Sequence, residues 1–222
     1  MANKGGAGYI KRLNAPKYFN IHRKEHRYVI KQDPGRHTQN KSVALALLLA
    51  KLGIGTKRLE YERVIKGGQV KVNGKVVKEP KYPVGLNDVV SVGDESFQVN
   101  INQRGQITAE SSKGKGQVYK IVGKYKYKDN SIMFRLHDGS IVKGSKEAKV
   151  NDSVTVSGSK ISKVIKLDSG ARCEVIDGVH VGNSGKISEI REGNIHKQKS
   201  VIVEPKSGQK FETLVKNIIV VE

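Results

Sequence analysis

Tyrosines are interleaved with lysines and arginines near the start of this chain, in the stretch YIKRLNAPKYF from Tyr9 to Phe19. Cations neutralise phosphates and aromatic rings stack on unpaired bases, so this alternation suits a nucleic-acid binder. The alternative is a solvated basic tail without a partner. We predict that the first 41 residues contact RNA or DNA, and the contacts predicted among their basic residues are Lys11, Arg12, Lys17, Arg36, His37 and Lys41.

A second group of cations lies on a predicted helix in the stretch KRLEYERVIKGG, for which Thr56 is a candidate N-cap. Tyr61, Val64 and Ile65 fall at i, i+3 and i+4, so they form one apolar face. That leaves a charged face, which either binds phosphates or merely keeps the helix soluble. Its members are Arg58, Glu62, Arg63 and Lys66.

The composition favours a polyanionic partner. The chain has 41 Lys and Arg against 21 Asp and Glu, a formal net charge of +20 over 222 residues. Membrane lipid is the weaker candidate, because the longest apolar run, VALALLL at Val43 to Leu49, is far shorter than the roughly 20 residues of a spanning helix. No apolar stretch follows the first charges, so we expect no secretory signal.

The sequence predicts neither a metal site nor a catalytic centre. Cys173 is the single cysteine, which excludes an intramolecular disulfide and favours a reducing compartment. Six histidines without paired ligand spacing do not predict a zinc site. His137 and Asp138 are adjacent in the stretch HDG, where such residues more often cap a turn than catalyse a reaction. We therefore predict no cofactor, no metal and no enzymatic activity.

The net charge falls along the chain, from +8 in residues 1–41 to +5 in 42–92, +6 in 93–168 and +1 in 169–222. The first segment has few aliphatic residues to offset the entropy of ordering, so we expect it to be extended or disordered without RNA. The fold class predicted is α+β, mostly β. Its parts are a basic N-terminal tail (1–41), a small helix–hairpin domain (42–92), a central β-barrel-like domain (93–168) and a C-terminal barrel (169–222).

The sequence of residues 42–92 predicts one compact structural unit. Ser42 is the candidate N-cap of a helix through VALALLLAKL, which Gly53 can end. Asn73 and Gly74 favour a two-residue type I′ turn in the stretch QVKVNGKVV, which predicts a hairpin. The stretch NDVVSV adds a strand.

Short strand candidates recur from Gly93 onward, including SFQVNI, SIMFRL and DSVTVSG, with a turn predicted at Ser157 to Ser159. This spacing is typical of a small closed barrel or sandwich. The stretch KYKYK at Lys124 to Lys128 alternates cations with aromatics. It either faces RNA or is an ordinary exposed strand, and both interpretations stay open.

The stretch HVGNSGKISEI contains glycines that superficially suit a phosphate-binding loop, but a helix must follow such a loop and KISEI alternates like a strand. It resembles the KOW motif, which implies an SH3-like barrel in which Gly182 and Gly185 permit the turn between two strands. With a net charge of +1, this barrel contacts either RNA or protein.

The order of a helix, a basic helix, IKGGQVKVNGKVV and YPVGLNDVVSV resembles the αL-type RNA-binding domain. The resemblance implies that the second helix and the hairpin lie against the RNA backbone. The residues that it implies for the basic face are Lys57, Arg58, Arg63, Lys66, Lys71, Asn73 and Lys75.

Nearly the whole chain resembles the S-four-e family of small-subunit (30S) ribosomal proteins of archaea and eukaryotes, through IKRLNAPK, DPGRH, YPVGLNDVVSV, HDG and NSGKISEI in this order. The resemblance implies a structural constituent of the small ribosomal subunit that binds and stabilises small-subunit rRNA, in the cytoplasm. Neighbouring ribosomal proteins are the other expected partners, and we expect a monomer outside the ribosome and no membrane contact. Eukaryotic members of the family have a C-terminal extension, whereas this sequence ends at Glu222, just after its last predicted strand. We therefore expect an archaeal source.

Two other functions remain possible for an αL-type domain. An RNA-modifying enzyme such as a pseudouridine synthase needs a further α/β catalytic domain, whereas the residues after 92 read as two small β-domains. A free-standing RNA-binding regulatory or stress protein is the second alternative. Co-sedimentation with 30S subunits distinguishes a ribosomal protein from both.

Overall fold

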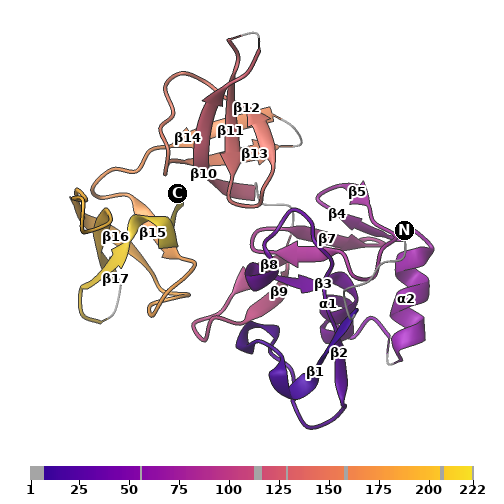
Figure 1. The fold of residues 1–222 in the computed structure, drawn as a ribbon. Coiled ribbons are helices and arrows are strands. Elements are labelled where there is room, and N and C mark those ends of the chain that lie inside the picture. Colours follow the sequence, from indigo (N-terminus) through magenta and orange to yellow (C-terminus); the bar gives the residue numbers. More distant parts are fainter. Residues whose placement is uncertain are drawn as a thin grey trace. The chain divides into compact units, whose positions relative to one another are not determined.

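The chain folds into small, mostly antiparallel β-structures with two short α-helices (Figure 1), as the predicted fold class requires. The computed structural model describes residues 8–55, 57–112, 117–128, 130–157, 160–205 and 208–221. Two compact units are present, residues 1–100 with 106–115 and residues 101–105 with 116–222. The first unit contains both helices, and the second contains only strands and one 3-10 turn among its described residues.

The N-terminal segment differs from the extended or disordered tail that the sequence predicts. Strands β1 (Tyr9–Lys11) and β2 (Tyr28–Ile30) pair in antiparallel fashion, with Tyr9 opposite Ile30. Phe19 and Val29 are buried, so the segment has enough apolar side chains to pack against the rest of its unit. Three 3-10 turns complete it, η1 (Arg12–Asn14), η2 (Lys17–Phe19) and η3 (Gln39–Lys41). Residues 1–7 of the predicted tail lie outside the described residues.

Both α-helices lie in the middle of the first unit's sequence, and neither described helix is long and apolar enough to cross a membrane. Helix α1 (Leu45–Lys51) starts later than predicted, because Ser42 belongs to strand β3 (Ser42–Ala44), which pairs with β6 (Pro83–Gly85). The prediction of Ser42 as the N-cap is therefore wrong. Helix α2 (Arg58–Lys66) matches its predicted position, and its candidate cap Thr56 lies outside the described residues.

A five-stranded sheet completes the first unit, in the order β5-β4-β7-β8-β9. Asn73 and Gly74 both have positive φ, 50° and 79°, as a type I′ turn requires, so the predicted hairpin is confirmed. The sheet continues past residue 92, where the sequence predicts a domain boundary, because β8 pairs with β7. The strands are β4 (Val70–Val72), β5 (Lys75–Val76), β7 (Val89–Val92), β8 (Glu95–Ile101) and β9 (Ile107–Ser111).

The central β-domain is a five-stranded antiparallel sheet in the order β12-β11-β10-β13-β14. Tyr119, Ile121 and Phe134 are buried in its core. Asp138 accepts hydrogen bonds from the backbone N (2.9 Å) and Oγ (2.7 Å) of Ser140, so the HDG stretch is a capped turn. The turn predicted at 158–159 lies outside the described residues. The strands are β10 (Gln117–Lys126), β11 (Ile132–Leu136), β12 (Ile141–Lys143), β13 (Ser153–Ser157) and β14 (Lys160–Ile165).

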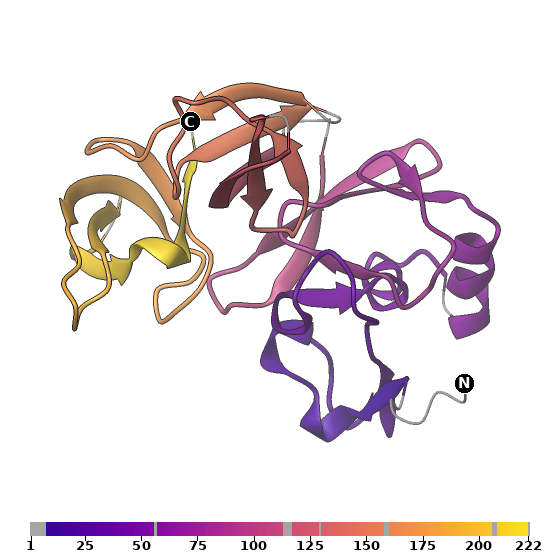
Figure 2. The ribbon, with the colours of Figure 1, turned by 45° about the horizontal axis from the view of Figure 1, so that its top comes forward.

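The C-terminal sheet has the order β18-β17-β16-β15-β19, and Figure 2 shows its strands curving around their core. Gly182, with φ 77°, lies in the connection before β16, and Gly185 faces the Glu204 carbonyl, where a Cβ would lie only 2.5 Å from the oxygen. A strand follows these glycines, so the structure excludes a phosphate-binding loop. The elements are β15 (Arg172–Val175), β16 (Ser184–Arg191), β17 (Ser200–Pro205), β18 (Phe211–Leu214), η4 (Val215–Asn217) and β19 (Ile218–Val221).

A buried lysine joins the two sheets of the second unit. Lys120 of β10 is 3% exposed, and its Nζ donates to the carbonyls of Val215 (2.5 Å) and Ile218 (3.0 Å). The backbone N of Val220 donates to Ser153 Oγ at 3.0 Å. These bonds satisfy backbone groups that would otherwise be buried without partners, so they hold β19 against the central domain.

Candidate nucleic-acid interface

Helix α2 separates its apolar and cationic side chains as its periodicity predicts. Ile65 is fully buried and Tyr61 and Val64 are partly buried. The helix begins where the Glu60 carboxylate accepts a bond from the backbone N of Lys57 at 3.2 Å, so an acid satisfies a donor at the first turn. Its exposed cations are Arg58, Arg63 and Lys66, preceded by Lys57.

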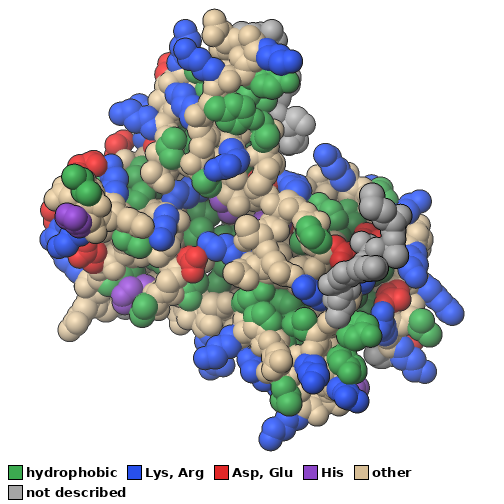
Figure 3. Space-filling model, in the orientation of Figure 1, with side chains coloured by type: hydrophobic (Ala, Val, Ile, Leu, Met, Phe, Trp, Pro, Cys, Tyr) green, Lys and Arg blue, Asp and Glu red, His purple; other side chains and the backbone are tan. Residues whose placement is uncertain are grey.

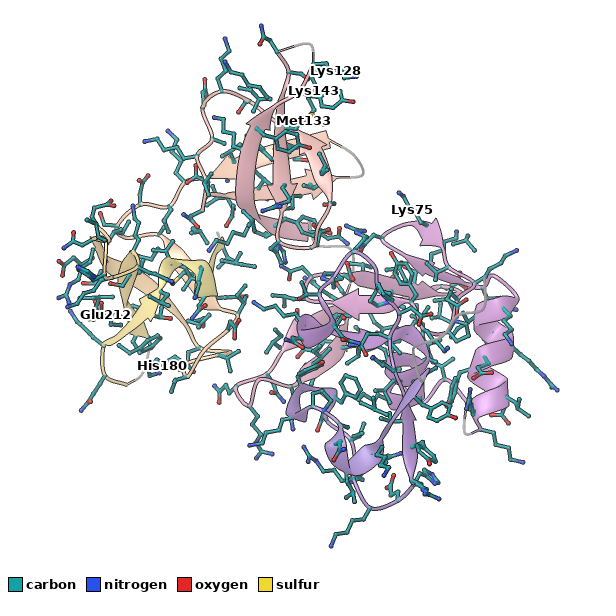
Figure 4. The ribbon with its side chains drawn as sticks, viewed as in Figure 1. Lys75, Lys128, Met133, Lys143, His180 and Glu212 are labelled. Carbon is teal, nitrogen blue, oxygen red and sulfur yellow. The ribbon has the colours of Figure 1, made fainter. Side chains whose placement is uncertain are left out.

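The β4–β5 hairpin presents further cations next in the chain. Val70 and Val72 are buried, and because side chains alternate along a strand, Lys71 between them points to solvent. Lys75 is exposed just after the turn, and Figure 4 shows it projecting outward from β5. Together with α2, the hairpin forms what we call the cationic face, defined as Lys57, Arg58, Arg63, Lys66, Lys71 and Lys75.

A buried carboxylate holds the hairpin turn. Asp88 is 1% exposed, and its Oδ1 accepts a bond from Asn73 Nδ2 at 2.7 Å, while Asn73 Oδ1 accepts one from the backbone N of Val89 at 2.9 Å. Asp88 Oδ2 accepts a bond from the backbone N of Gly85 at 3.0 Å and lies 2.7 Å from His37 Nε2. The carboxylate therefore connects the hairpin turn, β6 and the N-terminal segment.

Two residues predicted to contact RNA have structural roles in this network. His37 is 6% exposed and its ring packs against Gly85, which assigns the ring a structural role, and its contact with RNA stays a prediction. The amide of Asn73 is partly buried and bonded to Asp88 and Val89, which assigns it to the turn. Sequence reasoning missed Asp88 because its partner His37 is 51 residues away in the chain.

The remaining predicted contacts of the N-terminal segment differ in exposure. Arg12 is partly buried, and its Nη2 lies 3.0 Å from Glu25 Oε2, with a second bond from its Nε to the carbonyl of His22. Arg36 is also partly buried. The exposed members of the set are Lys11, Lys17 and Lys41.

Comparisons with known proteins match this architecture. Residues 45–90 match the S4 domain, and residues 4–40 match the RS4NT (NUC023) domain. Small ribosomal subunit protein eS4 of Methanocaldococcus jannaschii is 33% identical, covering 100% of this chain and 96% of the relative. The eS4 protein of Staphylothermus marinus is 32% identical, with coverages of 96% and 91%.

The chain belongs to the eS4 family of small ribosomal subunit proteins. A solved structure agrees, the crystal structure of 30S ribosomal protein S4e from Thermoplasma acidophilum, with a TM-score of 0.69 and 29% identity over 82% of this chain and 95% of that chain. In this eS4 chain the S4 match spans α1, α2 and the hairpin, so it covers the cationic face. The family predicted from the sequence is therefore confirmed.

Arg58 combines exposure with a fixed charge. Its Nε lies 2.6 Å from Glu62 Oε1, and the hydrogen bond and charge of Glu62 raise the pKa of Arg58 above its usual value. Its side chain is 71% exposed, so solvent screens the pair and a phosphate can compete for the guanidinium. Arginine is charged at any physiological pH, so Arg58 offers a permanent cation at this exposed position.

The β10–β11 hairpin of the eS4 chain presents the KYKYK stretch to solvent. Tyr125 and Tyr127 are exposed, 41% and 56%. Lys124 turns back instead, and its Nζ donates to the carbonyls of Lys146 (2.7 Å) and Ala148 (2.8 Å). Figure 4 places Lys128 near the tip of this hairpin. The lysines of the stretch are therefore not equivalent, and its contact with RNA stays a prediction.

The C-terminal sheet has acids beside its cations, and Figure 3 shows both signs gathered over β16 and β17. Arg191 lies 3.6 Å from Glu189 and 3.5 Å from Glu212. Two further pairs among the described residues are Lys199–Glu192 at 2.6 Å and Lys210–Glu204 at 3.4 Å. These carboxylates reduce the positive potential that the sheet offers to phosphates.

Proposed function

We propose that the chain is a structural, non-enzymatic constituent of the small ribosomal subunit that binds and stabilises small-subunit rRNA, supporting assembly and translation in the cytoplasm. Its membership of the eS4 family is the first support. The observation that carries the proposal is the cationic face, where cations of α2 and the hairpin are exposed above a buried apolar side. Such a surface neutralises phosphates without needing base-specific contacts.

The contacts that we propose are the six residues of the cationic face together with Lys11, Lys17 and Lys41, while Arg12 and Arg36 contribute from partly buried positions. We also propose that the C-terminal sheet is a KOW-type barrel. Supporting it are the glycine connection between β15 and β16 and the curved five-stranded sheet. Its nearly balanced charge favours a neighbouring ribosomal protein as its partner.

Sedimentation tests the proposal directly. Tagged chain expressed in an archaeal host should migrate with free 30S subunits and 70S ribosomes, and should leave the ribosomal fractions when high salt strips phosphate-bound proteins. A pool that stays at the top of the gradient at every salt concentration would refute a ribosomal role and favour a free-standing RNA-binding protein.

A further inference from the structure

Two exposed tyrosines lie side by side on the β1–β2 ribbon. Tyr9 is opposite Ile30 and Tyr28 is opposite Lys11, so the side chains of both tyrosines leave the ribbon on the same face. Tyr9 is 55% exposed and Tyr28 is 44% exposed. Their rings pack edge to face, with centroids 5.1 Å apart and planes at 64°.

The other aromatic pair of the N-terminal segment is used for folding. Phe19 is 1% exposed, and its ring packs edge to face against Tyr18, whose hydroxyl donates to the carbonyl of Gln39 at 2.6 Å. Core packing therefore explains Tyr18 and Phe19 but not Tyr9 and Tyr28. Exposed paired rings of this kind are typical of surfaces that stack on unpaired bases.

Cations surround the exposed pair. The guanidinium carbon of Arg27 lies 5.3 Å from the centroid of the Tyr28 ring. Arg58 of α2, Tyr9 and Tyr28 line a cavity of about 180 Å³, and Arg58 and Tyr28 also line a neighbouring cavity of about 540 Å³. The ribbon and helix α2, which carries part of the cationic face, thus both line these cavities, where the tyrosine rings lie beside the Arg58 side chain.

We propose that the Tyr9–Tyr28 pair is a stacking site for one unpaired RNA base, and that Arg58 binds the phosphate of the same nucleotide. The proposal rests on the proposed rRNA binding and adds a single-stranded element to it. A phosphate alone would not need the rings, and an apolar peptide would not need the guanidinium groups. An unpaired nucleotide uses both, because its base stacks and its phosphate accepts charge-assisted hydrogen bonds.

Salt-dependent binding separates stacking from charge. The full chain is titrated with small-subunit rRNA transcribed from the genome that encodes it, at several salt concentrations. Tyr28→Leu and Tyr9→Leu should each weaken binding about 5- to 150-fold, which corresponds to the ~1–3 kcal/mol of one stacked base. The dependence of log affinity on log salt should stay unchanged, since no phosphate contact is lost.

Two further variants serve as matched controls, and a third tests the phosphate contact. Tyr28→Phe keeps the ring and should bind like the parent chain. Leu13→Ala removes an apolar side chain of the same segment that is 64% exposed, more than either tyrosine, and should also bind like the parent. Arg58→Gln should make the salt dependence shallower by about one unit, as the loss of one phosphate contact predicts.

The outcomes distinguish the stacking site from the proposed function. If the parent binds the rRNA and Tyr28→Leu binds equally tightly, the stacking site is refuted and rRNA binding stands. An equal loss in Tyr28→Phe also refutes stacking, because the hydroxyl would then be the essential group. If the parent itself does not bind the rRNA, the proposed function and the stacking site are refuted together.

Discussion

The N-terminal unit has surface ion pairs, Arg12–Glu25 and Arg58–Glu62, as the C-terminal sheet does, but it also buries a carboxylate within its fold. In the first, Asp88 is 1% exposed and organises the hairpin turn from inside, while Lys66, Lys71 and Lys75 stay exposed outside. In the second, Glu189, Glu192, Glu204 and Glu212 remain on the surface within 3.6 Å of arginine or lysine nitrogens. The two regions therefore differ in net charge, +13 in residues 1–92 and +1 in residues 169–222, and also in where their carboxylates lie relative to the exposed cations.

This comparison teaches that a count of cations does not locate a phosphate-binding surface. The C-terminal segment has eight lysines and arginines, only one fewer than the segment 42–92. Its seven acids lower the net charge, and several of its lysines and arginines form ion pairs with surface carboxylates. A buried acid, by contrast, stabilises the fold without occupying the surface where phosphates must approach.

The largest expected effect comes from removing the buried carboxylate. Asp88→Ala leaves the Asn73 amide, the backbone N of Gly85 and His37 without their acceptor, so the free energy of unfolding of the N-terminal unit should fall by ~3–5 kcal/mol. Amide hydrogen exchange in β4 and β7 measures this loss. The matched control is Glu192→Ala, whose exposed pair with Lys199 should contribute at most about 0.5 kcal/mol. Equal losses in the two variants would contradict the comparison.

Charge reversal on the surface should have a smaller effect and should act on binding alone. Arg63→Glu with Lys66→Glu turns two favourable phosphate interactions into repulsion, so affinity for small-subunit rRNA should fall at least about tenfold, with a shallower salt dependence. Both side chains are exposed, so stability should change by within about 0.5 kcal/mol.

The control for this reversal lies on the other region. Lys197→Glu with Lys216→Glu changes the net charge by the same amount at two exposed positions of the C-terminal segment. Affinity should change by less than about threefold, which the same filter-binding titration measures. An equal loss in both double variants would show that total charge, and not the cationic face, determines binding.

The sequence predicted what depends on near neighbours and missed what depends on distant ones. Helix α2 and the Asn73–Gly74 turn follow from local periodicity and turn chemistry, and both are confirmed. The predicted start of α1 was wrong because Ser42 lies in a strand and pairs with Gly85. The sequence around Ser42 gives no sign of this pairing with a distant residue.

The same limit applies to the N-terminal segment. Its low aliphatic content predicts an extended or disordered tail, yet Phe19 and Val29 are buried, and Val29 pairs with Ile10 across the β1–β2 ribbon. His37 has the chemistry of an RNA contact and is also the partner of Asp88. The alternation of aromatic and basic residues alone was enough to predict that tyrosines of this segment stack on bases. Only the structure shows which of these aromatic side chains are exposed to solvent and which are buried.

The last expected effect depends on pH and concerns a lysine of the N-terminal unit that is not on the cationic face. Burial lowers the pKa of Lys51 to about 8, and its Nζ lies 3.4 Å from the carbonyl of Ile107. Between pH 8 and the pKa of 10.5 in the unfolded chain, the unfolded state binds more protons, so stability should rise with pH in that window. Burial raises the pKa of Tyr18 and Tyr61, which lowers stability only as the tyrosines of the unfolded chain ionise, near their ordinary value of 10.0.

Lys51→Met isolates this contribution, because the tyrosines are common to both chains. The free energy of unfolding, measured by urea denaturation at pH 7.5, 8.5 and 9.5, should rise more steeply for the parent than for Lys51→Met. The variant should be the more stable at pH 7.5, where the parent has to bury a charged ammonium group. Parallel pH profiles would mean that Lys51 is as well solvated as the lysines of the cationic face, and the contrast between buried and exposed charges in this unit would then rest on Asp88 alone.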